Sequence, residues 1–87
     1  MLNNIKRYAI PPNIEKKLFK FPKYIRDKFF FSLEKLLEDP SYPALRHKKV
    51  EGSEDWEFSI TMKYRATYVT EGDTLLITNI GKHEDVL

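Results

Sequence analysis

The sequence predicts a two-layer α+β protein in which a helical hairpin packs on a mainly antiparallel sheet of four to five strands. Two patterns predict this fold. Residues 12–38 carry apolar side chains at helical spacing in two consecutive segments. Residues 56–80 instead alternate apolar and polar side chains in three runs separated by short polar breaks, as half-buried strands do. The two helices need an apolar surface to cover, and one face of the sheet supplies it.

The composition is that of one small globular domain, residues 1–87. Hydrophobic residues make up 41% of the chain and charged residues 32%, which excludes a disordered chain. Cysteine is absent, no apolar run reaches the ~20 residues of a membrane span, and no signal-peptide pattern opens the chain. We therefore expect a cytoplasmic protein with no membrane partner. With no cysteine and two widely separated histidines, we also expect no metal and no cofactor.

Prolines divide the N-terminal half of the chain. Residues 3–9 are expected to form a short first strand, which two consecutive prolines end. The first helix covers residues 12–20, and Pro22 stops it because the residue before a proline is pushed out of the helical conformation. The second helix covers residues 23–38. The apolar stripes of the two helices are formed by Ile14, Leu18, Phe21, Ile25, Phe29, Phe30, Leu33, Leu36 and Leu37.

Four further strands are expected at residues 44–50, 56–62, 64–70 and 74–80. Along residues 56–63 the side chains divide by period two: Trp56, Phe58, Ile60 and Met62 lie on one side, and Glu57, Ser59, Thr61 and Lys63 on the other. The side chains that we expect to be buried are Leu18, Phe29, Leu33, Leu36, Phe58, Ile60 and Ile77.

The formal net charge of +2 is too small to predict nucleic-acid binding by itself. The positions of the basic residues are more informative. One basic run precedes the strands of residues 56–80, and further basic groups lie within them or after them: Arg46, His47, Lys48, Lys49, Lys63, Arg65, Lys82 and His83. A solvated face is the alternative interpretation of such a charge pattern.

Several of these features together resemble the RelE/ParE superfamily of toxins from bacterial and archaeal toxin–antitoxin systems. They are the helical hairpin, Lys-Lys-Val-Glu-Gly at residues 48–52, Trp-Glu-Phe-Ser-Ile at 56–60, the Tyr64-Arg65 pair that opens a strand, and Ile-Gly-Lys-His-Glu-Asp-Val at 80–86. The resemblance covers essentially the whole chain and implies a compact fold of β-α-α-β-β-β type.

The resemblance also implies a function and a partner. The RelE branch cleaves messenger RNA, commonly in the ribosomal A site, whereas the ParE branch poisons DNA gyrase and is not a nuclease. Both have a protein antitoxin that wraps the toxin, so we expect oligomers only with the antitoxin. The leading hypothesis is an endoribonuclease that acts on messenger RNA, free or on the ribosome. The alternatives are a ParE-type gyrase inhibitor and an inactive toxin that only binds its antitoxin.

The resemblance assigns roles to individual residues. Arg65 matches the family arginine that steadies the scissile phosphate, and His83 matches a tail position that carries the general acid. Trp56 matches a position that is often aromatic and is a candidate for stacking on a base, although Phe58 and Ile60 continue its side of the strand and favour a core position. The family's basic residues on the strand after the glycine turn are replaced here by Glu57 and Ser59, which favours the non-enzymatic alternatives.

Metal-free RNA cleavage needs a base, an acid and a cation, because the 2′-hydroxyl attacks the adjacent phosphate. Histidine suits the acid, since its pKa near ~6.5 makes both forms available, and arginine suits the phosphate. We therefore expect His83 as acid and Arg65 as phosphate clamp. The expected contacts to the RNA backbone are Lys48, Lys49 and Lys82. The candidate bases are His47, Asp85, Glu51 and Glu57, of which the first two are preferred; a solvated His83 and an Arg65–Glu57 ion pair are the structural alternatives.

Overall fold

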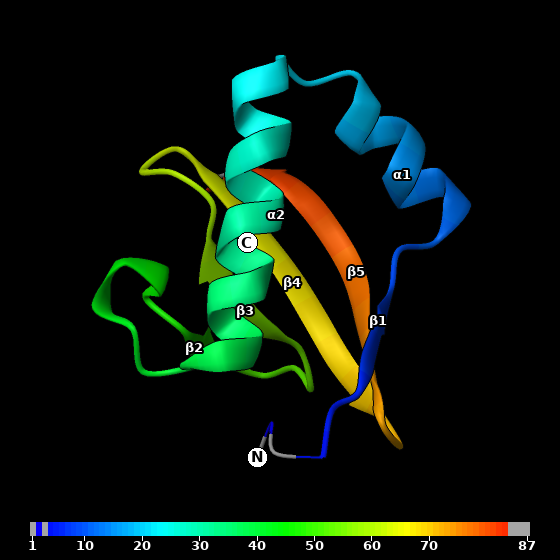
Figure 1. Ribbon diagram of the computed structural model, residues 1–87, viewed down its shortest axis with the longest axis vertical. Helices are drawn as coiled ribbons and strands as arrows, with labels where there is room; N and C mark the ends of the chain where they lie inside the picture. The colour runs from blue at the N-terminus through cyan, green and yellow to red at the C-terminus, as the bar shows by residue number, and fades with distance from the viewer. Residues whose placement is uncertain (1, 3, 84–87) are drawn as a thin grey trace.

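The structure is a computed structural model that describes residue 2 and residues 4–83. Its elements are, in order, β1 (Arg7–Ala9), α1 (Pro12–Phe19), α2 (Lys23–Glu38), the short 3-10 helix η1 (Pro43–Leu45), β2 (Lys48–Lys49), β3 (Trp56–Ser59), β4 (Tyr64–Glu71) and β5 (Thr74–Lys82). Both helices lie on one face of a single sheet (Figure 1). The predicted two-layer α+β fold is therefore confirmed.

Prolines set the start of both helices. Pro11 stands at the N-cap of α1 and Pro12 opens it, while Pro22 stands at the N-cap of α2. A proline at these positions loses no hydrogen bond within the helix, because the first N–H groups of a helix have no partner in it. The second helix has the predicted bounds, and the first ends one residue earlier than predicted.

The sheet has the strand order β1-β5-β4-β3-β2. β1 pairs with β5 in parallel, and the remaining neighbours are antiparallel. The first and last strands of the chain thus lie side by side (Figure 1). A two-residue turn joins β4 to β5, and Gly72 takes the positive φ of 59° that such a turn requires.

The core fills the space between the helices and the sheet. All seven side chains predicted to be buried are buried there: Leu18, Phe29, Leu33, Leu36, Phe58, Ile60 and Ile77. Met62, which the alternation placed on the same side, is 71% exposed instead. It lies in the turn after β3, because the N–H of Ile60 and the N–H of Thr61 both turn to the carbonyl of Tyr64 and end the strand pairing.

Three predicted strands are shorter than expected. The segment 44–50 holds only the two-residue β2, because η1 precedes it and Arg46 adopts a left-handed conformation with φ 47°. The strand expected at 56–62 ends at Ser59, where the turn begins. The strand expected at 3–9 is reduced to β1, Arg7–Ala9.

Candidate functional site

The sheet has a helix-covered face and an opposite face that we call the open face. β3 sends Phe58 into the core, so Glu57 and Ser59 belong to the open face. β4 sends Ala66 and Tyr68 into the core, and Arg65 shares the open face with Ser59, its direct partner in the strand register. Glu57 and Ser59 were expected on the side away from the core, yet these two residues, and Arg65 and Thr67 beside them, are all buried. The open face therefore carries a buried polar cluster.

Arg65 is the centre of this cluster. Its side chain is held by neighbours on both sides and only 8% of the residue is exposed. Nη1 donates to the Ser59 hydroxyl and, at 3.2 Å, to the carbonyl oxygen of Thr61. The hydrogen bonds of the described residues leave Nη2 unused. The alternative in which Arg65 pairs with Glu57 is wrong, because Glu57 pairs with Lys48.

His83 lies beside Arg65. Arg65 Nε donates to His83 Nδ1 over 3.3 Å, so the neutral ring carries its proton on Nε2. β5 positions the histidine by continuing straight through Gly81, which pairs with Arg65, and the His83 N–H donates to the carbonyl oxygen of Lys63 at 2.8 Å. Gly81 does not end the strand, which runs to Lys82. The imidazole itself is exposed to solvent.

His47 lies on the helix-covered side of the sheet, away from Arg65. Its Nε2 lies 2.5 Å from the hydroxyl of Tyr68, a core residue. The His47 ring stacks on the Tyr68 ring with centroids 5.7 Å apart, and it packs on the Trp56 ring with centroids 5.0 Å apart. Burial lowers the pKa of His47, although a backbone hydrogen bond at Pro40 acts in the opposite direction. Burial also raises the pKa of Tyr68, which remains a neutral donor. The core interpretation of Trp56 is supported by the same contacts and by its packing on the core.

Glu57 is the second charged group buried on the open face. Its Oε1 lies 3.4 Å from Lys48 Nζ, while Oε2 has no hydrogen-bond partner among the described residues. Lys48 pairs with Glu57 in the strand register and shares its face, whereas Lys49 pairs with Trp56. A cavity of about 420 Å³ lies here, lined by Lys48, Lys49, Val50, Glu51 and Glu57.

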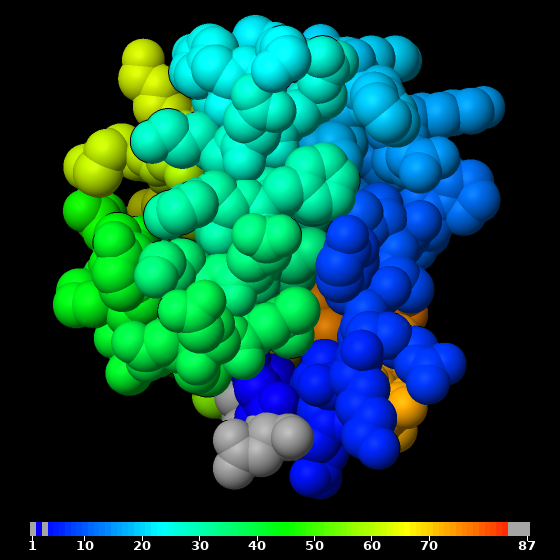
Figure 2. Space-filling model, viewed as in Figure 1, coloured from blue at the N-terminus to red at the C-terminus, as the bar shows by residue number. Residues whose placement is uncertain are grey.

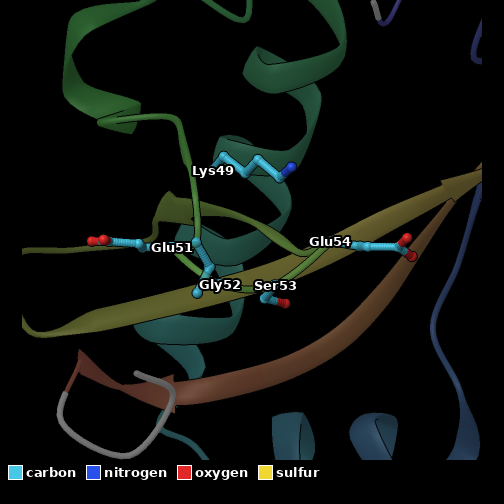
Figure 3. A pocket seen from close by; sticks show the side chains of 6 residues that line it. Lys49, Glu51, Gly52, Ser53 and Glu54 are labelled. Atoms are coloured by element: carbon cyan, nitrogen blue, oxygen red, sulfur yellow. The ribbon is translucent and has the colours of Figure 1, made fainter.

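The loop of residues 50–55 borders the same region. Figure 3 shows it crossing in front of β4, with α2 behind the sheet. Asp55 at its end accepts a hydrogen bond of 3.4 Å from the hydroxyl of Thr78 on β5, which agrees with this view. Glu51, a candidate base, is exposed in this loop. The loop thus covers part of the open face and leaves the end with Arg65 and His83 outside it.

The remaining predicted residues divide as follows. Lys82 ends β5 and is exposed, and Asp85 lies outside the described residues.

Sequence reasoning missed Ser59 and Thr61 as the groups that hold Arg65, and Tyr68 as the partner of His47. Alternation had placed Ser59 and Thr61 on one side of a strand, and strand pairing with β4 was the additional information needed. The described residues contain no cluster of three or more His, Cys, Asp or Glu side chains suited to a metal.

Solved structures of bacterial and archaeal toxins share this fold. The YoeB–YefM complex from Staphylococcus aureus has a TM-score of 0.73 at 13% identity, covering 91% of this chain and 97% of that one. The RelE–RelB complex from Pyrococcus horikoshii has a TM-score of 0.72 at 18% identity, with coverages of 91% and 94%. A double mutant of the E. coli toxin RelE in the free state has a TM-score of 0.68 at 20% identity, with coverages of 93% and 86%.

The chain therefore has the fold of the RelE/ParE toxin superfamily. Two of the three neighbours are complexes of the toxin with a second protein, and a further one, from Methanococcus jannaschii, is described as an antitoxin–toxin complex. No protein-family model matches the sequence, and no curated protein matches it either. Within the described residues, none of the helices has the length and apolar character needed to cross a membrane.

Proposed function

We propose that the chain is the toxin of a type II toxin–antitoxin system and acts as a metal-independent endoribonuclease on messenger RNA. One observation carries this proposal. Arg65 is only 8% exposed, its guanidinium is hydrogen-bonded to the imidazole of His83, and no carboxylate lies within salt-bridge distance of it among the described residues. A buried cation is costly unless an anion compensates it. A phosphate matches the arginine fork and would be that anion.

The reaction uses the two side chains in different roles. A phosphate bound by Arg65 draws the guanidinium toward itself and releases Nδ1 of His83, which then takes a proton. The protonated ring is the general acid for the 5′-oxygen that leaves when the 2′-oxygen attacks phosphorus. Arg65 offsets the additional negative charge on the phosphate during this attack. The products are a 2′,3′-cyclic phosphate and a 5′-hydroxyl.

An exposed lysine on the open face would hold a flanking phosphate. Lys48 is exposed on the edge strand β2 and shares the face of Glu57 and Arg65. Lys49 pairs with Trp56 and Lys82 pairs with Tyr64, so the register places these two lysines on the helix-covered side of the sheet edge. An RNA strand that crosses from β4 to β2 would therefore meet Lys48 beside the scissile phosphate.

The protein partner would be an antitoxin, and the surface of α2 supports this part of the proposal. Tyr24 is 64% exposed and Phe31 is 53% exposed, one on either side of Lys28 on the same helix. The outer surface of α2 lies across the front of the molecule in Figure 2. Exposed aromatic side chains gathered in this way are typical of a protein–protein interface.

The test is single-turnover cleavage of RNA, free and bound to ribosomes, with the two histidines compared by the same substitution. We expect His83→Gln to lose ~10²–10⁴-fold in cleavage rate at an unchanged melting temperature, since the exposed ring supports no core. His47→Gln should show the reverse: a lower melting temperature and the wild-type rate while folded. Arg65→Lys should also cleave slowly, because a point charge does not reproduce the fork.

Two results would contradict the proposal in different ways. Wild-type cleavage by a folded His83→Gln protein would remove His83 from the reaction. A wild-type protein that cleaves no RNA but inhibits DNA gyrase would instead be a ParE-type toxin.

A further inference from the structure

We propose that the groove between α2, η1 and the turn after β3 binds a phosphate group, at a site separate from the proposed cleavage site. The groove is a cavity of about 400 Å³ to which each of these three elements contributes side chains. Lys28 comes from α2, Arg46 follows η1, and Ser59, Thr61 and Met62 come from the end of β3 and its turn. Residues far apart in the sequence thus meet at one place on the surface.

The groove contains cations and no carboxylate. Lys28 and Arg46 both line it, whereas no Asp or Glu does. Neither cation forms an ion pair with any residue that the structure describes. Nη2 of Arg46 donates to the thioether sulfur of Met62 at 3.3 Å, and a thioether is a weak acceptor. Two cations on one cavity repel each other, and a bound anion would offset both charges.

Two hydroxyl groups of the groove retain a hydrogen to donate. Thr61 Oγ1 accepts the N–H groups of Lys63 and Tyr64, each at 3.2 Å. Ser59 Oγ accepts from Nη1 of Arg65, and this cation makes the Ser59 hydroxyl a stronger donor. In both residues the oxygen is used as an acceptor, so the hydroxyl hydrogen is left for a ligand. Two cations and two hydroxyl donors suit a phosphate, which offers more acceptor oxygens than a carboxylate.

The backbone at Arg46 supports a role for its side chain. Arg46 has a positive φ of 47°, and no other described residue except glycine has one. A side chain makes this left-handed conformation costly, whereas glycine adopts it freely. The chain turns here because η1 ends, and the Arg46 N–H donates to the carbonyl oxygen of Pro43 at 3.2 Å. An arginine therefore stands where glycine would fit more easily, and such strained residues gather at ligand-binding sites.

The groove and the cleavage site are neighbours that use different donors. Nη1 of Arg65 turns to Ser59 and Thr61, which line the groove, whereas Nε turns to His83. A phosphate in the groove would accept from the Ser59 hydroxyl and leave Nη2 of Arg65 for a second phosphate. A free phosphate ester and the backbone of an RNA strand bring the same chemistry to the groove. Only the RNA source rests on the proposed endoribonuclease function.

The test is a titration of the isotope-labelled protein with inorganic phosphate and with AMP, followed by NMR. We expect saturable shifts of the backbone amides of residues 44–47 and 59–63. Arg46→Gly and Lys28→Gln should each weaken binding ~10-fold or more, because each removes a hydrogen bond from a charged donor. The melting temperature of Arg46→Gly should not fall, since glycine suits the positive φ. This result separates the loss of a ligand contact from a loss of folding.

Two matched variants locate the binding. Lys23→Gln removes a lysine of the same helix that pairs with Asp27 outside the groove, and it should bind phosphate as the wild type does. His83→Gln should also bind it unchanged, because His83 belongs to the neighbouring site. The affinity of Arg46→Gly for a single-stranded RNA then distinguishes the sources. A loss for RNA and AMP together assigns the groove to the RNA backbone, and a loss for AMP alone assigns it to a free phosphate ester.

Two outcomes would overturn the inference. One is the absence of saturable shifts at the groove with either probe, and the other is binding that Arg46→Gly and Lys28→Gln leave unchanged. Each is measured without cleavage, so RNA cleavage by such a protein would leave the endoribonuclease function intact. Phosphate binding in the groove of a protein that cleaves no RNA would support the groove and remove the proposed function instead.

Discussion

The two histidines show how the face of a sheet decides the chemistry of a side chain. His83 extends the register of β5 on the open face, where its ring meets Arg65 and solvent. His47 precedes β2 and is packed between Trp56 and Tyr68 on the helix-covered side. Its Nε2 lies within hydrogen-bond distance of the Tyr68 hydroxyl, which ties the ring to a core side chain.

The neutral state of His47 makes the stability of the fold depend on pH. Burial lowers the pKa of His47 in the folded protein below its ordinary value of 6.5, so the unfolded chain takes up the proton first as pH falls. The contribution of His47 is therefore complete above about pH 6.5 and declines as pH falls below it. Urea unfolding at pH 7.5 and 5.5 checks this: the loss of unfolding free energy between the two should be smaller in His47→Gln than in His83→Gln. An equal loss in the two variants would contradict it.

At the scale of elements, α2 is the support on which the open face depends. Its buried residues Phe29, Leu33 and Leu36 are fully covered, and Phe29 packs on Phe58 with ring centroids 6.3 Å apart. Phe58 lies in β3 between Glu57 and Ser59, which face the other way. Packing of α2 against this strand therefore fixes the backbone that presents the polar cluster.

Leu33→Ala should cost ~2–5 kcal/mol in unfolding free energy, because it leaves a cavity in a small core. The neighbouring Glu34 is exposed, so Glu34→Ala is the matched control and should stay within ~0.5 kcal/mol of the wild type. Urea unfolding of both variants measures the difference. Equal stabilities would show that Leu33 does not face the core.

At the scale of the whole molecule, the helices and the open face separate two kinds of surface. The outer side of α2 exposes aromatic residues, whereas the open face of the sheet presents Arg65 and, at its β2 edge, Lys48. The net charge is only +2, so affinity for RNA would come from the position of these groups rather than from the total. An antitoxin on α2 and an RNA on the open face of the sheet would bind opposite faces of the two-layer molecule.

RNA binding should weaken as salt rises, because each phosphate contact releases a counterion. Lys48→Ala should reduce the slope of log affinity against log salt by ~0.7, the value for one contact to a single strand. Lys23, which pairs with Asp27 on α2, is the matched control, and Lys23→Ala should leave the slope unchanged. Affinity measured by fluorescence anisotropy at several salt concentrations checks both. An affinity that does not vary with salt would place the RNA on another surface.

The sequence by itself determined the layers of this protein. Prolines bounded the two helices, helical periodicity named their buried stripe, and alternation identified Phe58, Ile60 and the sheet, because these signals depend on neighbours along the chain. The resemblance to RelE and ParE toxins supplied Arg65 and His83. Their contact depends on the antiparallel pairing of β4 and β5 about the turn at Gly72.

Only the tertiary structure decided which polar residues meet. Strand shortening at Arg46 and Ser59 came from local turns whose hydrogen bonds the alternation pattern does not reveal, and the side of the sheet on which His47 packs depended on the register of β2 against β3. The burial of Glu57 needed Lys48 and the loop of residues 50–55 together. A residue's own type fixes what it can donate or accept, but burial and pairing are properties of the packed layers, and these decide whether a carboxylate such as Glu57 is a surface charge or a buried partner of a lysine.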